Sequence, residues 1–311
     1  MSNHSKRYPS PSRDAIMHNF KERRNWGRWG DDDAVGAVNL ITVEKRLSAL
    51  ASVQNGRTVS LSRPYPKDPS SLNPTPAQHF MRTFDRGDEG DGAVVDYYGF
   101  IYHGHTFTHV DALCHIWDSD GIWQGRDPNE AIDSSTGATF ADVTAWNQGI
   151  FTRAVLLDVP RFRGEPYVTY DRPVMGAELQ DIADALGVTV EPGDALLVYS
   201  GREAYQADHP DDFFGSPPSP GLHASCSIFI RDKDVSMLGW DMMDHRPSEY
   251  GLAWPVHGVI YSFGVVLLDN ALLQPLAEAC AEEGRYEMLL CVLPLNIQGG
   301  TGSPVNPIAV F

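Results

Sequence analysis

The residues best suited to chemistry in this sequence are four histidines and an aspartate that lie close together in the chain. His103, His105, His109 and His115 fall within thirteen residues and Asp111 lies among them, although the whole chain of 311 residues has only 11 histidines. Neutral imidazoles and carboxylates are ligands that Zn²⁺, Mn²⁺ and Fe²⁺ accept. A histidine-rich set without cysteine leaves coordination positions for water and substrate, so the cluster favours a catalytic metal site.

The spacing of these residues predicts a bend in the backbone. In a straight strand, His105 and His109 would lie about 13 Å apart, which is too far for both imidazoles to reach one metal easily. His109 and Asp111 are two residues apart and share one face of a strand. Gly104 and Thr106 disfavour a helix. We therefore expect a short strand that continues into irregular backbone.

The surrounding sequence predicts alternating helices and buried strands. Thr42 is a suitable N-cap for a helix that ends near residue 54, and further helices are expected at 176–187 and 271–284. Strands are expected at 58–62, 154–158, 195–199, 235–239, 259–268 and 287–293. The segment 65–92 is rich in Pro, Ser, Asp and Gly and predicts a long excursion over the surface. This pattern indicates an α/β fold with a mixed central sheet.

Composition limits the class of protein and its partners. Residues 1–25 show no apolar period and are expected to form a flexible arm, whereas 26–311 lack an internal linker and predict one domain. A formal charge of −17 disfavours binding to nucleic acid or to an anionic membrane. No apolar run spans a bilayer, no secretory signal is found, and the four cysteines form no CxxC pair, so we expect a cytoplasmic protein.

The histidine motif resembles that of the cyclase family of metal-dependent hydrolases, which includes bacterial kynurenine formamidases and isatin hydrolases. Phe107 and Leu113 stand where the family usually has Gly and Pro. The residues that match the motif are His105, Thr108, His109, Asp111 and His115. Weaker similarities extend the resemblance over most of the chain and lie at residues 29–33, 36–42, 153–158, 192–194 and 299–304.

The resemblance implies a barrel-like mixed sheet flanked by helices, and a centre that holds one or two Mn²⁺ or Zn²⁺ ions. In the family, a later histidine and an acidic residue twelve positions further complete a two-metal site that Asp111 would bridge. His257 and Asp269 have that spacing, with Asp269 in place of the usual Glu. Asp269 also suits the N-cap of the helix that follows it. Members of this family form homodimers or homotetramers, so the resemblance implies a homodimer or homotetramer here as well.

The expected activity is hydrolysis of an amide, lactam, lactone or related C–N or C–O bond in a small molecule by metal-activated water. His115 is the candidate for proton transfer to the leaving group, because histidine titrates near neutral pH. Phe107 and Trp117 are candidates for an aromatic wall of the substrate pocket.

Two other functions fit part of the pattern. His109, Asp111 and a distant His257 also match the two-histidine, one-carboxylate triad of non-haem Fe(II) oxygenases. Those enzymes usually have a jelly roll of many short strands, which the helix-interspersed pattern here does not predict. A metal-stabilised protein without turnover is the third possibility, and only an assay separates it from a hydrolase.

Overall fold

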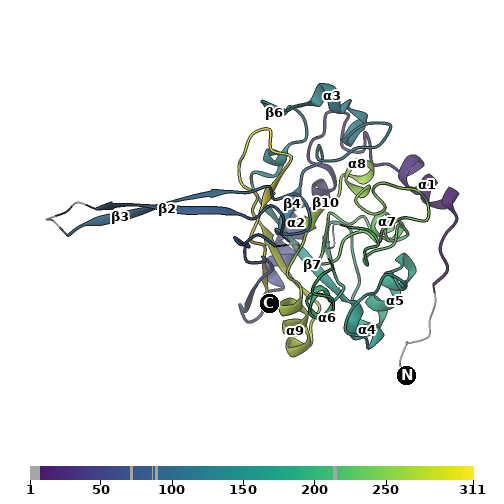
Figure 1. Ribbon diagram of the computed structural model, residues 1–311. Coiled ribbons are helices and arrows are strands. Elements are labelled where there is room, and N and C mark those ends of the chain that lie inside the picture. The colour runs from purple at the N-terminus through teal and green to yellow at the C-terminus, as the bar shows by residue number, and fades with distance from the viewer. Residues whose placement is uncertain (1–7, 71–72, 86, 88–89, 213–215) are drawn as a thin grey trace.

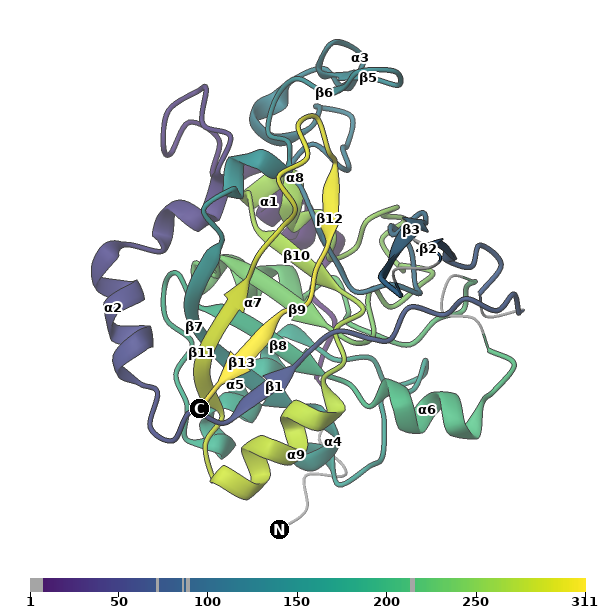
Figure 2. The ribbon, with the colours of Figure 1, turned by 90° about the vertical axis from the view of Figure 1, so that its left-hand side faces the viewer.

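A curled, mixed sheet of nine strands lies at the centre of the computed structural model, which describes residues 8–70, 73–85, 87, 90–212 and 216–311. The sheet forms a half-barrel, as Figure 2 shows. In spatial order its strands are β1 (Thr58–Ser60), β13 (Ile308–Val310), β11 (Glu287–Val292), β7 (Ile150–Asp158), β8 (Ala195–Tyr199), β9 (Met237–Trp240), β10 (Val266–Asp269), β4 (His109–Asp111) and β12 (Gly302–Pro304).

The four middle strands form the buried centre of the molecule. Strands β7, β8, β9 and β10 run parallel, and all residues of β8, β9 and β10 are buried. Such strands have near-continuous apolar sequences because both of their faces are covered. On either side of them the pairing becomes antiparallel, between β11 and β7 and between β10 and β4. The predicted α/β fold with a mixed, barrel-like sheet is confirmed.

Helices surround the sheet and several begin and end as the sequence predicts. Thr42 Oγ1 accepts a hydrogen bond from Lys45 N at the start of α2, and Gly187 ends α5 with a φ of +70°. The α-helices are α1 (Arg13–Glu22), α2 (Val43–Ala51), α3 (Pro128–Ala131), α4 (Val159–Arg163), α5 (Gly176–Leu186), α6 (Arg202–Asp208), α7 (Cys226–Asp232), α8 (Val259–Phe263) and α9 (Gln274–Glu283). Short 3₁₀ helices lie at Gly36–Leu40, Trp123–Gly125 and Val143–Trp146.

The prediction of a flexible arm over residues 1–25 is wrong for α1. Ser12 caps this helix by accepting a hydrogen bond from Ala15 N, and the helix buries Ile16, Asn19 and Phe20. Phe20 stacks on Phe263 with ring centroids 5.9 Å apart. The buried face of α1 consists of three positions, which is too short a period to stand out among charged residues. Residues 1–7 lie outside the described part of the chain.

The predicted strand at 259–268 is also wrong in its first half. Residues Val259–Phe263 form the helix α8, and only Val266–Asp269 form the strand β10. Gly264 separates them with a φ of +69°, where an added Cβ would also meet the indole of Trp123. Every residue of both elements is buried, and a buried helix and a buried strand share the same continuous apolar sequence.

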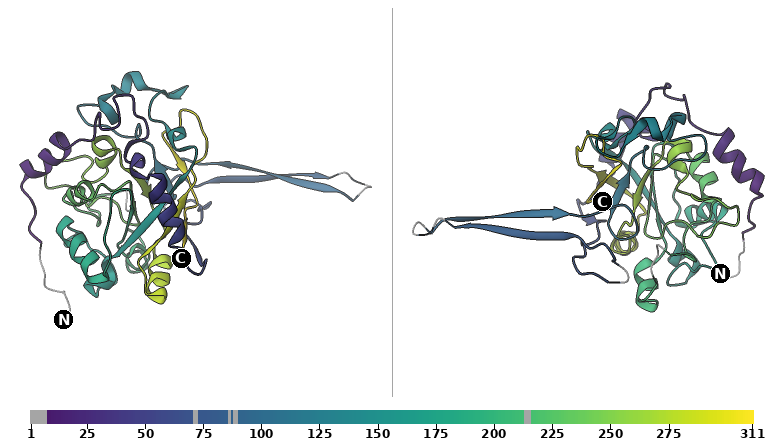
Figure 3. Two further views of the ribbon diagram at one scale, coloured as in Figure 1. Left: turned by 180° about the vertical axis from the view of Figure 1, so that it is seen from behind. Right: turned by 45° about the horizontal axis from the view of Figure 1, so that its top comes forward.

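The segment 65–92, which the sequence predicts to run over the surface, contains the first strand of a long β-hairpin. Strands β2 (Gln78–Asp85) and β3 (Gly92–Gly99) pair with each other in an antiparallel ladder and project from the body (Figures 1 and 3). A second small ribbon is formed by β5 (Ile132–Asp133) and β6 (Gly137–Ala138). The chain enters strand β4 and the histidine cluster soon after it leaves the hairpin.

Candidate metal centre

Strand β4 places its two polar residues opposite a third on strand β10. His109 and Asp111 alternate with Val110, so both project from one face of β4. In the antiparallel pair of β4 and β10, His109 lies directly opposite Asp269. Residues opposite each other in such a pair share a face of the sheet and lie close together. The strand register therefore brings His109, Asp111 and Asp269 to the same surface.

The expected bend lies directly before β4. Residues 103–106 form turns, Gly104 has a φ of +118°, and His103 returns to Asp111 with 2.9 Å between Nδ1 and Oδ1. After β4 a further turn brings His115 back, with 3.9 Å between its Nε2 and the same oxygen. Turns on both sides of a three-residue strand thus gather ligands that a straight strand would separate.

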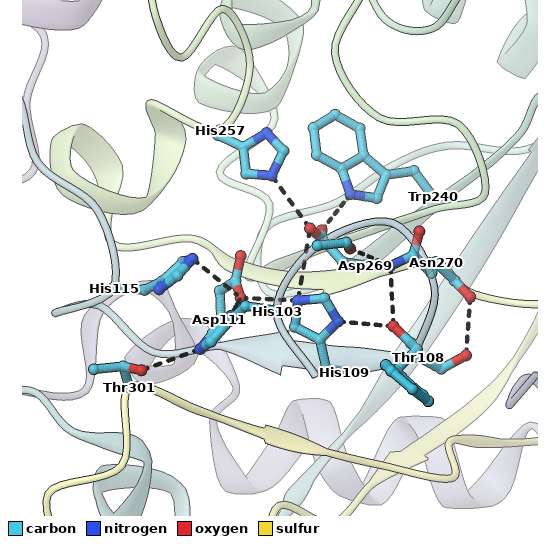
Figure 4. A network of polar contacts seen from close by, with 12 residues as sticks. His103, Thr108, His109, Asp111, His115, Trp240, His257, Asp269, Asn270 and Thr301 are labelled. Carbon is cyan, nitrogen blue, oxygen red and sulfur yellow. Dashed lines mark hydrogen bonds and ion pairs between the residues drawn. The ribbon is translucent and has the colours of Figure 1, made fainter. Parts of the chain in front are cut away.

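Two groups of metal-ligand atoms result, and Asp111 belongs to both. The ligand atoms of each group lie within 4.8 Å of one another. His109 Nε2 lies 3.3 Å from Asp111 Oδ1 and 4.0 Å from Asp269 Oδ2, and His257 Nε2 lies 3.2 Å from Asp269 Oδ2 (Figure 4). The first group is His103, His109 and Asp111, and the second is Asp111, His257 and Asp269.

The polar atoms of the first group fit a cation. Asp111 Oδ1 and His103 Nδ1 are buried and form no geometrically acceptable hydrogen bond, although they lie 2.9 Å apart. Burying polar atoms in this state costs free energy unless another partner satisfies them. A carboxylate oxygen surrounded by imidazole nitrogens is suited to a divalent ion with nitrogen and oxygen ligands.

Neighbouring groups orient the ligands. His109 Nδ1 lies 2.8 Å from the carbonyl oxygen of Phe107, and His257 Nδ1 lies 2.5 Å from Asp244 Oδ2. When these nitrogens carry the proton, each Nε2 faces the cluster with a free lone pair. Trp240 Nε1 donates to Asp269 Oδ1 at 2.5 Å and leaves Oδ2 toward His257 (Figure 4).

Charge and burial set the protonation states of the cluster. Burial alone would raise the pKa of Asp111, but the adjacent histidines His115, His103 and His109 hold that pKa well below its usual value. Burial lowers the pKa of His115 to about 4 and that of His105 to about 4. Both imidazoles are therefore neutral at pH 7, as ligation or proton acceptance requires.

Burial also acts on His257, but here the neighbouring carboxylates outweigh it. Burial by itself lowers the pKa of His257, whereas Asp244 and Asp269 raise the pKa well above its usual value. In a protein without a cation, this histidine therefore carries the positive charge that offsets the two carboxylates. A divalent ion beside Asp269 would take over that role and displace the proton.

The structure brings together most of the residues that the sequence nominates. His109, Asp111, His257 and Asp269 share the two groups, and His115 stacks on His103 with ring centroids 3.7 Å apart. His105 lines the same cavity of about 160 Å³ but belongs to neither group. The other residues that line this cavity are Gly104, His109, Asp111, His115, Met243, Asp244, Arg246, Trp254, His257 and Asp269.

The two aromatic residues nominated for the pocket wall do not line this cavity. Phe107 is 1 % exposed and packs against the rings of Tyr65 and Phe100, whereas Trp117 is 47 % exposed. The turns around β4 direct Phe107 into the core, so closeness in sequence does not give closeness to the site. Trp254, far later in the chain, is the aromatic side chain that lines it.

The sequence analysis placed His103 in the cluster without a role and did not nominate Asp244 or Arg246 as site residues. His103 lies two residues before His105 in the histidine motif, and this closeness in sequence was the signal that it belongs to the site. Asp244 follows the carboxyl end of β9, where side chains of neighbouring parallel strands meet. No sequence feature indicated Arg246, because its place beside the cavity depends on how the loop that contains it folds.

A larger cavity of about 990 Å³ lies elsewhere and is lined by His223, His245 and Glu249 among others. In the part of the chain that the structure describes, no group of metal-ligand atoms converges there. The smaller cavity is therefore the candidate site, because every member of the two ligand groups except His103 lines it. Within the same described part, none of the helices combines the length and apolar character needed to cross a bilayer.

Comparison with known proteins identifies related sequences and folds. The model of the cyclase family matches residues 57–245. A crystal structure of a novel cyclase is 31 % identical, covers 93 % of this chain and 99 % of its own, and has a TM-score of 0.82. No match is found among curated proteins.

Two isatin hydrolases share the fold at lower identity. Isatin hydrolase A from Labrenzia aggregata, bound to benzyl benzoate, is 18 % identical, with a TM-score of 0.59 over 86 % of this chain and 98 % of its own. Isatin hydrolase A from Ralstonia solanacearum is also 18 % identical, with a TM-score of 0.54 over 86 % of this chain and 97 % of its own.

Proposed function

This chain belongs to the cyclase family, and on that premise we propose that it is a metal-dependent hydrolase that cleaves an amide, lactam, lactone or related bond of a small molecule. The observation that carries the proposal is the pair of ligand groups that share Asp111, all of whose members except His103 line one small cavity. The fold shared with two isatin hydrolases, named for a cyclic amide, supports carbon–nitrogen bonds as the first class to test.

The donor set suits one or two Mn²⁺ or Zn²⁺ ions. His103 and His109 would hold one ion with Asp111, and His257 and Asp269 would hold a second with the same carboxylate. A divalent ion bound there supplies a Lewis acid and lowers the pKa of a bound water to about 7. The part of the chain is to orient these imidazoles so that each Nε2 faces the cluster, which the contacts with Phe107 O and Asp244 Oδ2 do.

His115 is the side chain best placed to move a proton. It lines the cavity, its side chain is 25 % exposed, and its pKa is lowered to about 4, so at neutral pH it is free to accept a proton. A neutral imidazole can take a proton from the attacking water and deliver it to the leaving nitrogen or oxygen.

Arg246 is proposed to anchor a carboxylate of the substrate. Arg246 lines the cavity, and among the described residues no acidic side chain forms an ion pair with its guanidinium. Arg202, the other arginine beside the site, is buried and is bonded to Asn270 and to the carbonyl oxygen of His105. An unpaired guanidinium favours a planar carboxylate by forming two parallel hydrogen bonds, and Trp254 offers an apolar wall beside it.

The oxygenase alternative is disfavoured by the fold. Its usual jelly roll consists of packed antiparallel strands, whereas the sheet here has four parallel strands at its centre. That assignment would also leave His103 and His115 beside the cluster without a role.

The proposal is tested on the purified chain by elemental analysis and by hydrolysis of a panel of amides, lactams and lactones. The panel contains matched pairs with and without a carboxylate, such as N-formylanthranilate and formanilide. We expect one or two Mn²⁺ or Zn²⁺ per chain, activity that a chelator removes and the metal restores, and faster turnover of the carboxylate member. Full activity in folded, metal-free protein contradicts the proposal, and iron with oxygen consumption supports the oxygenase instead. Equal turnover of both members removes the role of Arg246 alone.

A further inference from the structure

The large cavity of about 990 Å³ is separated from the candidate metal centre by one segment of the chain. Asp244 and Arg246 line the small cavity, whereas His245 and Pro247 line the large one. Isolated β-bridges at Asp244 and Arg246 show that this segment is extended, and successive residues of an extended segment point to opposite sides. The segment 244–247 is therefore a wall that the two cavities share.

The size and walls of the large cavity suit a small molecule. Pockets for small molecules commonly have a volume of about 300–1,000 Å³ and combine apolar walls with a few polar groups. One side of this cavity is formed by the chain before α1, which runs past α5 (Figure 1), where Tyr8 donates a hydrogen bond to Asp181 Oδ2 at 2.6 Å. Pro173, Met175 and Pro247 supply apolar groups.

Two rings form a further wall of the large cavity. Tyr170 and His245 both line it, with ring centroids 4.6 Å apart and ring planes tilted by 31°. Burial lowers the pKa of His245, so its imidazole is neutral at pH 7 and adds no positive charge to this wall. The face of a tyrosine ring attracts a positively charged group.

The arginines that line the large cavity are already paired. Arg163 donates two hydrogen bonds to the carboxylate of Glu178, at 2.8 and 2.7 Å, and Arg172 forms an ion pair with Glu165. Such charge-assisted contacts satisfy a guanidinium strongly. An anionic ligand would therefore have to compete with a glutamate for either arginine.

Two further carboxylates, those of Asp171 and Glu249, line the large cavity without such a cation. Among the described residues, neither forms an ion pair with a lysine or an arginine. Glu249 Oε1 lies 3.0 Å from His223 Nε2, and burial lowers the pKa of His223, so this partner is neutral at pH 7. Burial alone would raise the pKa of Glu249, but hydrogen bonds from Tyr250 and His223 lower it, so Glu249 is an anion. The large cavity therefore carries negative charge that no cation offsets.

We propose that the large cavity is a second binding site, which takes an organic amine with an aromatic body, and that the shared wall couples its occupancy to the metal centre. The ammonium group pairs with Glu249, and the aromatic body packs on Tyr170 and on the apolar groups of the lining. The amine site stands on its own residues, whereas the coupling rests on the proposed metal-dependent function.

The coupling follows from the place of Asp244 in the shared wall. Its Oδ2 lies 2.5 Å from His257 Nδ1, and its Oδ1 accepts a hydrogen bond from Val256 N at 2.6 Å. A ligand that displaces His245 also displaces Asp244, because the two residues are adjacent in one extended segment. The orientation of His257, a candidate metal ligand, then changes. Coupling of this kind is reciprocal, so a bound metal changes the affinity for the amine by the same factor.

Calorimetric titration of the full chain with benzylamine, benzyl alcohol and benzoate tests the amine site. The three probes share one ring and differ in charge, so benzylamine should bind about fivefold or more tightly than the other two. Glu249→Gln should weaken the binding of benzylamine by about fivefold. The matched control Glu282→Gln, at an exposed carboxylate on α9 outside the cavity, should not. Equal affinities for the three probes, or equal affinities of the two variants for benzylamine, overturn the amine site.

The same titration on His109→Ala separates the amine site from the metal centre. This variant should lack the metal and should still bind benzylamine, and adding Glu249→Gln to it should weaken binding again. Loss of binding in His109→Ala would place the amine on the metal and overturn the amine site. If wild type itself binds no metal, the proposed function fails, and the benzylamine titrations still decide the amine site.

Equilibrium dialysis against Mn²⁺ or Zn²⁺, with and without benzylamine, tests the coupling. The metal affinity of wild type should change by about fivefold or more at saturating benzylamine. Tyr170→Ala combined with Glu249→Gln should need about 10-fold more benzylamine for the same change, because both contacts of the amine are removed. An unchanged metal affinity in wild type, or the same response in both proteins, overturns the coupling. Circular dichroism confirms that each variant is folded.

Discussion

The histidine cluster and the hairpin are neighbours in sequence and opposites in environment. Residues 103–115 bury polar groups around Asp111, which is 1 % exposed, whereas 78–99 expose large apolar side chains such as Phe80, which is 62 % exposed. Folded proteins normally bury large apolar side chains and expose charged ones, so both regions depart from the usual pattern. Each inversion marks a part of the molecule whose groups are not satisfied within the described chain: a cation would satisfy the buried polar groups, and a covering surface would bury the exposed apolar ones.

The largest effect is expected at the centre of the cluster. His109→Ala removes the imidazole that lies between Asp111 and Asp269, so metal and activity should be lost together. Loss of the ion removes several kcal/mol of transition-state stabilisation, and turnover should fall by about 10⁴-fold or more. Elemental analysis and turnover measure this, with His18→Ala on the exposed side of α1 as control. Retention of metal and rate in His109→Ala would contradict the ligand assignment.

His115→Ala should separate ligation from proton transfer. If His115 moves the proton, the variant keeps its metal and turnover falls by about 10²–10⁴-fold. Because His115 also stacks on His103, added imidazole provides the discriminating measurement: rescue of the rate supports proton transfer, and no rescue supports a packing role. An unchanged rate would remove the role, and loss of metal would make His115 a ligand.

A smaller effect is expected at the carboxylate that orients a ligand. Asp244→Asn weakens the contact with His257 Nδ1, and such changes typically cost about 10–100-fold in metal affinity. Equilibrium dialysis against Zn²⁺ or Mn²⁺ should show this loss for one ion per chain. Asp32→Asn, at a carboxylate whose side chain is 94 % exposed, is the control. Equal affinities in the two variants would show that His257 is held without Asp244.

The smallest effect is expected on the hairpin, and it sharpens the contrast between the two regions. Phe80→Ala should change the free energy of unfolding by no more than about 0.5 kcal/mol, because the ring is exposed. Phe107→Ala, at a buried ring two residues before His109, should cost about 3–5 kcal/mol. Urea unfolding followed by tryptophan fluorescence measures both variants. Similar losses for the two would show that the hairpin packs on its own chain.

Local sequence predicted the elements whose signals are short-range. The cap at Thr42, the glycine that ends α5 and the apolar strands β7 and β8 all lie where the sequence places them. Helices α1 and α8 were missed because their assignment depends on what covers them. A three-position apolar face and a fully buried five-residue helix have no distinctive period by themselves.

The candidate site divides in the same way. The types and spacing of His109 and Asp111 indicated a metal site from the sequence, because only a few side chains ligate divalent ions. The partners of these residues could be identified only from the tertiary structure. His109 faces Asp269 because of the register of β4 and β10. Asp244, in the loop after β9, contacts His257. The pocket wall was predicted from proximity in sequence, and Trp254 rather than Phe107 or Trp117 lines the cavity.

The sequence by itself determined which chemical groups this protein can bring to a reaction and where most of its buried strands lie, because residue type and local apolar period are properties of the chain alone. The tertiary structure decided which groups meet and which arginine lines the cavity. The physical reason is that directions in space depend on strand register and turn geometry, and these are set by contacts between residues that lie far apart in the sequence.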